Sequence, residues 1–158
     1  FEVETTKFFP CPPVPQNPRN HCTPILEVLQ DPDDDGKKIV VMPRLMNYEP
    51  IFDTVGEVGV QFMHENFVAH RDYGVLNIAV EPSQPHPHGF HPVNVWRNPA
   101  NDGFASYITR TKCRPRYYII DFGLSCCYGP EKSPLEHRRP SRCNPFHTDI
   151  YYLGNLLK

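Results

Sequence analysis

The chain has 158 residues, 39% of them hydrophobic and 12% aromatic, a composition typical of one globular domain with a hydrophobic core. Its 16 basic and 18 acidic residues are spread along the chain and give a net charge of −2, so no basic face indicates a nucleic-acid partner. No run of 18 apolar residues is present, and charged residues stand where a signal peptide would be apolar, so we expect no membrane partner and a cytoplasmic or nuclear location.

The first predicted elements form a hairpin. After a proline-rich lead, residues 1–22, strands are predicted at 23–29 and 38–42. The turn between them ends in Asp35-Gly36, a dipeptide that tolerates the left-handed backbone conformations of hairpin turns. An ordinary hairpin of any fold would satisfy this pattern as well.

A helix is predicted next, over Glu49 to Glu65. Its apolar residues have a spacing compatible with a helix, although Gly56 and Gly59 interrupt the pattern. Beyond it, residues 77–80 form a short apolar segment that is predicted to be a strand.

The second half of the chain contains the strongest strand pattern and a helix. Residues 116–120 are rich in aromatic and β-branched side chains, which favour strands. The apolar run from Asp149 to Leu157 is predicted to begin a buried helix with Thr148 or Asp149 near its N-cap. Strands mixed with helices, without an internal repeat, predict an α+β fold.

Two short motifs carry the chemistry. His70-Arg71-Asp72 is followed after four residues by Asn77, and Asp121-Phe122-Gly123 directly follows the predicted strand 116–120. In this order and context they match the catalytic loop and the metal-binding triplet of protein kinases. In phosphoryl transfer, Asp72 would orient the acceptor hydroxyl and take its proton, within a catalytic loop that includes His70 and Arg71. Asn77 and Asp121 would supply the hard oxygen ligands that Mg²⁺ prefers.

Beyond these motifs, the chain resembles the eukaryotic-type protein kinase domain, in particular the kinase-like proteins of mushroom-forming (basidiomycete) fungi. The resemblance covers nearly all of the chain after Thr23. It rests on the segments Met42–Leu45, Phe62–Glu65, Val68–Asp72, Gly89–Pro92, Tyr107–Thr111, Arg116–Ser125 and Asn144–Gly154.

The resemblance implies a partial protein-kinase-like fold over residues 1–158. In this division, residues 1–22 are the lead, 23–45 are an N-lobe hairpin and hinge, and 46–158 are part of the C-lobe with an insertion at 81–115. The implied activity is transfer of the γ-phosphate of ATP to a protein hydroxyl by a kinase of the Ser/Thr type, with ATP and Mg²⁺ as cofactors.

Further residue roles are implied by the resemblance. Met42 would be the gatekeeper beside the adenine, the carbonyl of Pro43 would accept a hydrogen bond from the adenine amine, and the N–H of Leu45 would donate to the ring. Proline fits at this step because only an acceptor is needed there. Asp149 would hold the backbone of the catalytic loop, whereas without the resemblance it would be an ordinary carboxylate near a helix N-terminus.

Several features depart from the kinase pattern. No Gly-rich loop and no Val-Ala-Ile-Lys strand precede the hairpin, and Gly74 stands where Ser/Thr kinases place a lysine near the γ-phosphate. No Ala-Pro-Glu follows Gly123, and the sequence stops at Lys158, early in the predicted last helix. These departures leave a second hypothesis open: a catalytically inactive kinase-like module, or a fragment, that binds a protein partner.

Two other groups of side chains are considered. A metal site formed by His86, His88 and His91 would need cysteine or carboxylate partners that the spacing does not offer, so solvated loop residues are expected instead. A phosphate on a hydroxyl after the triplet would pair with Arg71. The candidate hydroxyls are those of Ser125, Ser133, Ser141 and Thr148.

Overall fold

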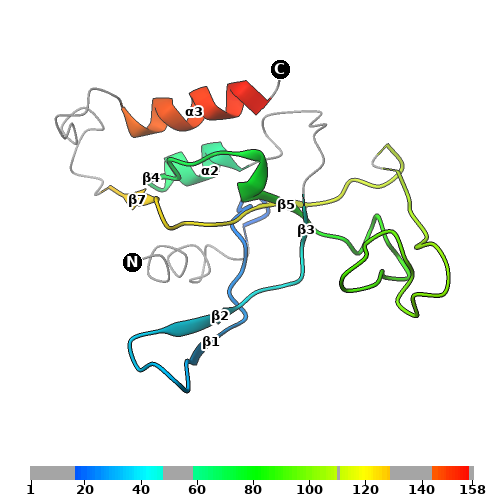
Figure 1. Ribbon diagram of the computed structural model, residues 1–158. Helices are drawn as coiled ribbons and strands as arrows, with labels where there is room; N and C mark the ends of the chain where they lie inside the picture. The colour runs from blue at the N-terminus through cyan, green and yellow to red at the C-terminus, as the bar shows by residue number, and fades with distance from the viewer. Residues whose placement is uncertain (1–16, 48–58, 110, 129–143, 157–158) are drawn as a thin grey trace.

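The computed structural model describes residues 17–47, 59–109, 111–128 and 144–156 (Figure 1). The elements within these ranges are β1 (Glu27–Gln30), β2 (Lys38–Val41), β3 (Met46–Asn47), α2 (Val60–Glu65), β4 (Val68–Ala69), η3 (Val75–Asn77), β5 (Ile78–Val80), β6 (Tyr117–Ile119), β7 (Cys126–Cys127) and α3 (Pro145–Leu156). The combination of small antiparallel sheets and helices confirms the α+β class. None of the described helices is both long and apolar enough to cross a membrane.

The predicted hairpin is confirmed, although its first strand begins at Glu27 and not at Thr23. Strands β1 and β2 pair antiparallel, with Glu27 opposite Val41 and Gln30 opposite Lys38. The turn is closed locally, because the Asp34 side chain accepts a hydrogen bond from Gly36 N at 2.9 Å. Figure 1 shows this hairpin at the opposite end of the molecule from α2 and α3, which lie side by side.

The three-stranded sheet has the order β3–β5–β6, and both of its pairs are antiparallel. Strands β5 and β6 confirm the predictions for residues 77–80 and 116–120. The two-residue strand β3, which pairs Met46 with Val80, was not predicted. Residues from the proline-rich lead extend the sheet, because Cys22 forms a parallel bridge with Ile119 and Ile119 N donates to His21 O at 2.7 Å.

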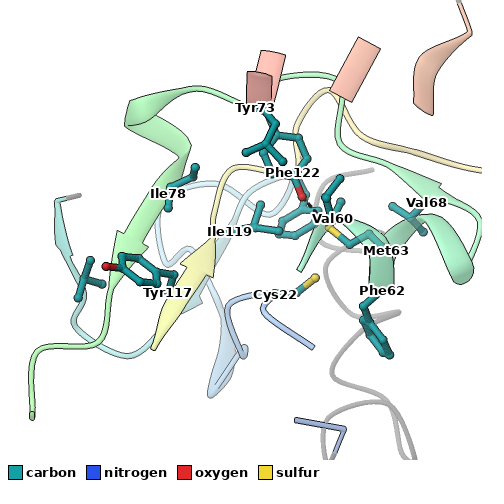
Figure 2. Close-up of a cluster of buried hydrophobic side chains, with 12 residues drawn as sticks. Cys22, Val60, Phe62, Met63, Val68, Tyr73, Ile78, Tyr117, Ile119 and Phe122 are labelled. Carbon is teal, nitrogen blue, oxygen red and sulfur yellow. Dashed lines mark hydrogen bonds between the residues drawn. The ribbon is translucent and has the colours of Figure 1, made fainter. Parts of the chain in front are cut away.

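The hydrophobic core lies between this sheet and the two helices (Figure 2). Two of its members belong to the loops that carry the motifs, because Tyr73 follows Asp72 and Phe122 is the centre of Asp121-Phe122-Gly123. Both motif loops are therefore packed directly against the core, through Tyr73 and Phe122. Its members are Cys22, Val60, Phe62, Met63, Val68, Tyr73, Ile78, Val80, Tyr117, Ile119, Phe122 and Leu153.

Helix α2 confirms the last part of the helix predicted over 49–65, and residues 48–58 lie outside the described ranges. Gly59 does not interrupt this helix but occupies its N-cap, with φ of 69°. A Cβ atom at Gly59 would lie 2.6 Å from the His21 Cβ. Both the left-handed backbone and the close approach of His21 therefore require glycine here.

Helix α3 begins earlier than predicted. Thr148 and Asp149, which were expected near the N-cap, lie within the first turns, because the helix starts at Pro145. The Asn144 side chain accepts a hydrogen bond from Phe146 N at 3.0 Å, which is the role of a capping residue. Proline suits the first helical position because its missing N–H would have no partner there.

Replacing two glycines by alanine tests this account of the fold. We expect Gly59→Ala to lower the free energy of unfolding by about 2–4 kcal/mol, through the left-handed backbone and the contact with His21. Gly74→Ala is the matched control, because Gly74 has an extended backbone and no atom within 4 Å of its Cβ position. Its free energy of unfolding should change by less than about 1 kcal/mol. Equal effects of the two substitutions in urea unfolding would contradict the account.

Candidate functional site

The β5–β6 pair brings the two predicted metal ligands to the same end of the sheet. Ile78 lies opposite Ile119 in this antiparallel pair, so the residue before β5 and the residues after β6 are neighbours. A hydrogen bond from Ile120 N to Asn77 O, 3.0 Å long, continues the pairing past the strand ends. Asn77 and Asp121 are therefore placed at one edge although 44 positions separate them in sequence.

Asp72 joins these two residues through Asn77. The Asn77 side-chain nitrogen donates to the Asp72 backbone oxygen and to Asp72 Oδ2, both at 2.9 Å. Because both bonds use the amide nitrogen, the amide oxygen of Asn77 remains the atom suited to a hard metal ion. Asp72 is partly exposed, so its carboxylate is both oriented and accessible from solvent.

The backbone of the loop that carries Asp72 is held by the buried carboxylate of Asp149. Asp149 in α3 has no exposed surface. Its Oδ2 accepts hydrogen bonds from His70 N and from His64 Nε2, each at 2.9 Å, and its Oδ1 accepts one from Arg71 N at 2.6 Å. The expectation that Asp149 holds the backbone of the 70–72 loop is confirmed by these contacts. The role of His64 was missed, because its partner lies 85 positions away and no local pattern announces it.

His70 links the two motifs. Its ring is fully buried, and Nε2 lies 3.1 Å from Ile120 O, directly before Asp121. The ring contacts Tyr73 and Phe122, with ring centroids 5.1 and 5.2 Å apart. Burial lowers the pKa of His70 below its ordinary value of 6.5, and the Ile120 carbonyl and nearby carboxylates offset this only in part. The neutral ring donates from Nε2 to Ile120 O.

Backbone strain is concentrated at the motifs. Among the described non-glycine residues, positive φ angles occur at Phe67, Arg71, Asn101 and Asp121. Two of these four belong to the motifs, with φ of 70° at Arg71 and 59° at Asp121. The Asp121 side chain steadies its own turn by accepting a hydrogen bond from Gly123 N at 3.2 Å. Such strain persists where the surroundings enforce it, and it is common at functional sites.

The Arg71 side chain faces the strand after the triplet, where Nη1 donates to Cys126 Sγ at 3.1 Å. Ser125 is fully buried and its hydroxyl donates to His70 O at 3.3 Å, so it is not accessible as a phosphate acceptor. The Thr148 hydroxyl donates within the first turn of α3, to Asn144 O. Ser133 and Ser141 lie outside the described residues.

The predicted hinge residues lie at the other end of β5. Met42, Pro43 and Leu45 belong to the segment between β2 and β3, and β3 places Met46 opposite Val80. The three residues of β5 span about 10 Å, and the segment leads into the end of β5 that is opposite to Asn77 and Asp121. The two groups of predicted site residues thus occupy opposite ends of one strand.

His86 and His91 have structural roles, whereas His88 is exposed, as expected of a loop residue. The expectation of a solvated side chain is wrong for His86, which is buried, packs against Phe90 and Tyr107, and has Nδ1 3.0 Å from Ser106 O. His91 Nδ1 accepts hydrogen bonds from the backbone of Val93 and Asn94. In the part of the chain that the structure describes, no three His, Cys, Asp or Glu side chains form a group that would hold a metal ion.

The buried His70 predicts a pH dependence of stability. Because its pKa is lowered in the folded state, the unfolded chain binds a proton that the folded chain does not, once the pH falls below 6.5. Stability is therefore full above pH 6.5 and should fall below it by up to roughly 1.4 kcal/mol per pH unit from this residue. The His70→Gln variant keeps a donor for Ile120 O but does not titrate, so its urea unfolding should vary less between pH 7.0 and 5.5. The same pH dependence in both proteins would contradict this role.

Comparisons with known proteins add no assignment. No protein family model matches the chain, and no curated protein sequence matches it significantly. The case for a function therefore depends on the geometry of the site and on the motifs.

Proposed function

We propose that the chain is a partial protein-kinase-like domain that transfers the γ-phosphate of ATP to a protein hydroxyl. The observation that carries the proposal is the meeting of Asp72, Asn77 and Asp121 at one end of the β5–β6 pair. Phosphoryl transfer needs positioned charges and little covalent chemistry, so an oriented carboxylate beside two oxygen ligands is a suitable site. ATP as donor also fits the cytoplasmic or nuclear location expected from the sequence.

In this proposal Asp72 is the general base. Its Oδ2 is held by Asn77 Nδ2, which keeps the carboxylate in one orientation while it remains partly exposed to an incoming hydroxyl. Asn77 and Asp121 offer one amide oxygen and one carboxylate. This set fits Mg²⁺, which commonly takes one or two protein oxygens and fills its other positions with phosphate oxygens and water. When bound, the ion would neutralise charge on the phosphates.

The base of the nucleotide would be bound at the other end of β5. There the Pro43 carbonyl and the Leu45 N–H offer one acceptor and one donor, and Met42 is 46% exposed. A nucleotide lying along the strand would place its phosphates beside Asn77 and Asp121. The separation of the two groups of residues along β5 therefore supports the proposal.

The second candidate function is a catalytically inactive kinase-like module that binds a protein partner. Gly74 favours it, because its position beside Asp72 carries no side chain where the kinase resemblance implies a lysine. The backbone there is extended and the space around a Cβ is open, so packing does not require glycine. Without a cation at this position, stabilisation of the transferring phosphoryl group is reduced.

Nucleotide binding separates the two functions. In a thermal-shift titration with ATP and Mg²⁺, we expect the apparent stability to rise, by about 2.7 kcal/mol when free nucleotide reaches 100 times its dissociation constant. The increase should be lost in Asp121→Asn, which removes the charged metal ligand. Asp33→Asn is the control, because it removes the same charge from the exposed hairpin turn. A cooperative melt of the unmodified chain without any nucleotide-dependent shift would contradict the kinase proposal and favour the inactive module.

A further inference from the structure

Arg44 connects the predicted hinge to the insertion. Its Nη2 donates to His91 O at 3.1 Å and to Pro92 O at 3.0 Å. The guanidinium also lies over the Phe90 ring, 4.1 Å from the centroid. These contacts use both the charge and the planar shape of arginine, since two carbonyl oxygens and an aromatic face are engaged by one group.

The part of the insertion that receives Arg44 is folded and not a loose loop. Phe90 and His86 are buried, with exposed fractions of 7% and 6%. The unit is closed by hydrogen bonds across it, from Ile108 N to Pro85 O at 2.8 Å and between the His86 ring and Ser106 O. Its base is fixed to the sheet, because Glu81 N donates to Arg116 O at 2.8 Å just beyond the β5–β6 pair. Residues 85–108 therefore offer a firm anchor for Arg44.

The segment 42–45 needs such an anchor. It belongs to no strand and runs between β2 and β3, so neither sheet fixes its backbone. Recognition by one carbonyl and one N–H depends on their being held within about 0.5 Å of the binding geometry. Order that is present before binding also lowers the entropy lost on binding.

We propose that Arg44 is a positioning residue for nucleotide binding, and that the folded unit of residues 85–108 supports the base-binding end of the site through it. The inference rests on the proposed function, because it assigns the 42–45 segment to the base. Arg44 itself does not contact the reacting atoms. It acts by fastening the segment whose Pro43 carbonyl and Leu45 N–H would read the base.

Two ligands distinguish binding at the two ends of the site. ATP with Mg²⁺ would engage both ends, and inorganic triphosphate with Mg²⁺ would engage only the end with Asn77 and Asp121. We expect Arg44→Ala to weaken ATP binding about tenfold, as measured by calorimetry, because the base-reading segment loses its fixed geometry. Triphosphate binding should not change, because it depends on the Asn77 and Asp121 end. The ATP affinity of Arg44→Lys should lie between that of the unmodified chain and that of Arg44→Ala, since lysine keeps the charge but loses the planar donor pair. Arg97→Ala is the control, because the Arg97 side chain also lies over an aromatic ring, that of Phe104, but this contact is within the unit 85–108 and does not join it to segment 42–45.

Amide hydrogen exchange provides a readout that does not depend on nucleotide. Exchange in segments 42–45 and 86–92 should accelerate together in Arg44→Ala, whereas exchange in segment 42–45 should remain unchanged in Arg97→Ala. If the unmodified chain binds ATP and Arg44→Ala binds it equally well, the inference is wrong while the proposed function stands. Equal weakening of ATP and triphosphate would also overturn it, because the effect would not be specific to the base. If the unmodified chain binds neither probe, the proposed function fails and the positioning role fails with it.

Discussion

The Asp149 carboxylate in α3 is fully buried and accepts three hydrogen bonds: one from the His64 side chain in α2, and one each from the backbone N–H groups of His70 and Arg71. A buried charge is tolerated only when it is paired in this way, and each of its partners is fixed in return. The left-handed backbone of Arg71 is one consequence, because its amide must point toward α3. Asp72 follows directly, so its position depends on this buried contact.

His70 connects this hydrogen-bonded loop to the second motif. Its ring bonds to the carbonyl of Ile120, and its own carbonyl accepts from the Ser125 hydroxyl, so the residues on either side of Asp121-Phe122-Gly123 are tied to the first loop. Phe122 packs against the same ring from the core. The two motifs therefore form one unit with a shared interior. The end proposed to bind the base is formed separately, by the segment after β2 and the folded insertion that Arg44 contacts.

Local sequence patterns predicted the elements that depend on local chemistry. The hairpin follows from its Asp-Gly turn, and strands β5 and β6 follow from their apolar and aromatic residues. Long-range pairing was not predictable in the same way. The partner of His64, the pairing of Val68 with Cys127 and the burial of His86 each depend on residues distant in sequence. The start of α3 differs from the prediction because Asn144 caps the helix and Pro145 begins it, whereas the apolar run begins only at Asp149.

The most direct test of this account is residue-resolved amide hydrogen exchange of the unmodified chain and of Asp149→Asn, followed by NMR. The amides of His70 and Arg71 should exchange slowly in the unmodified chain, at rates near that of Ile119 in β6. In Asp149→Asn, one carboxylate oxygen is replaced by a donor, so at least one of these two amides should lose its protection while Ile119 keeps it. Fast exchange of both amides in the unmodified chain, or full protection of both in the variant, would contradict the claim that the buried carboxylate builds the site.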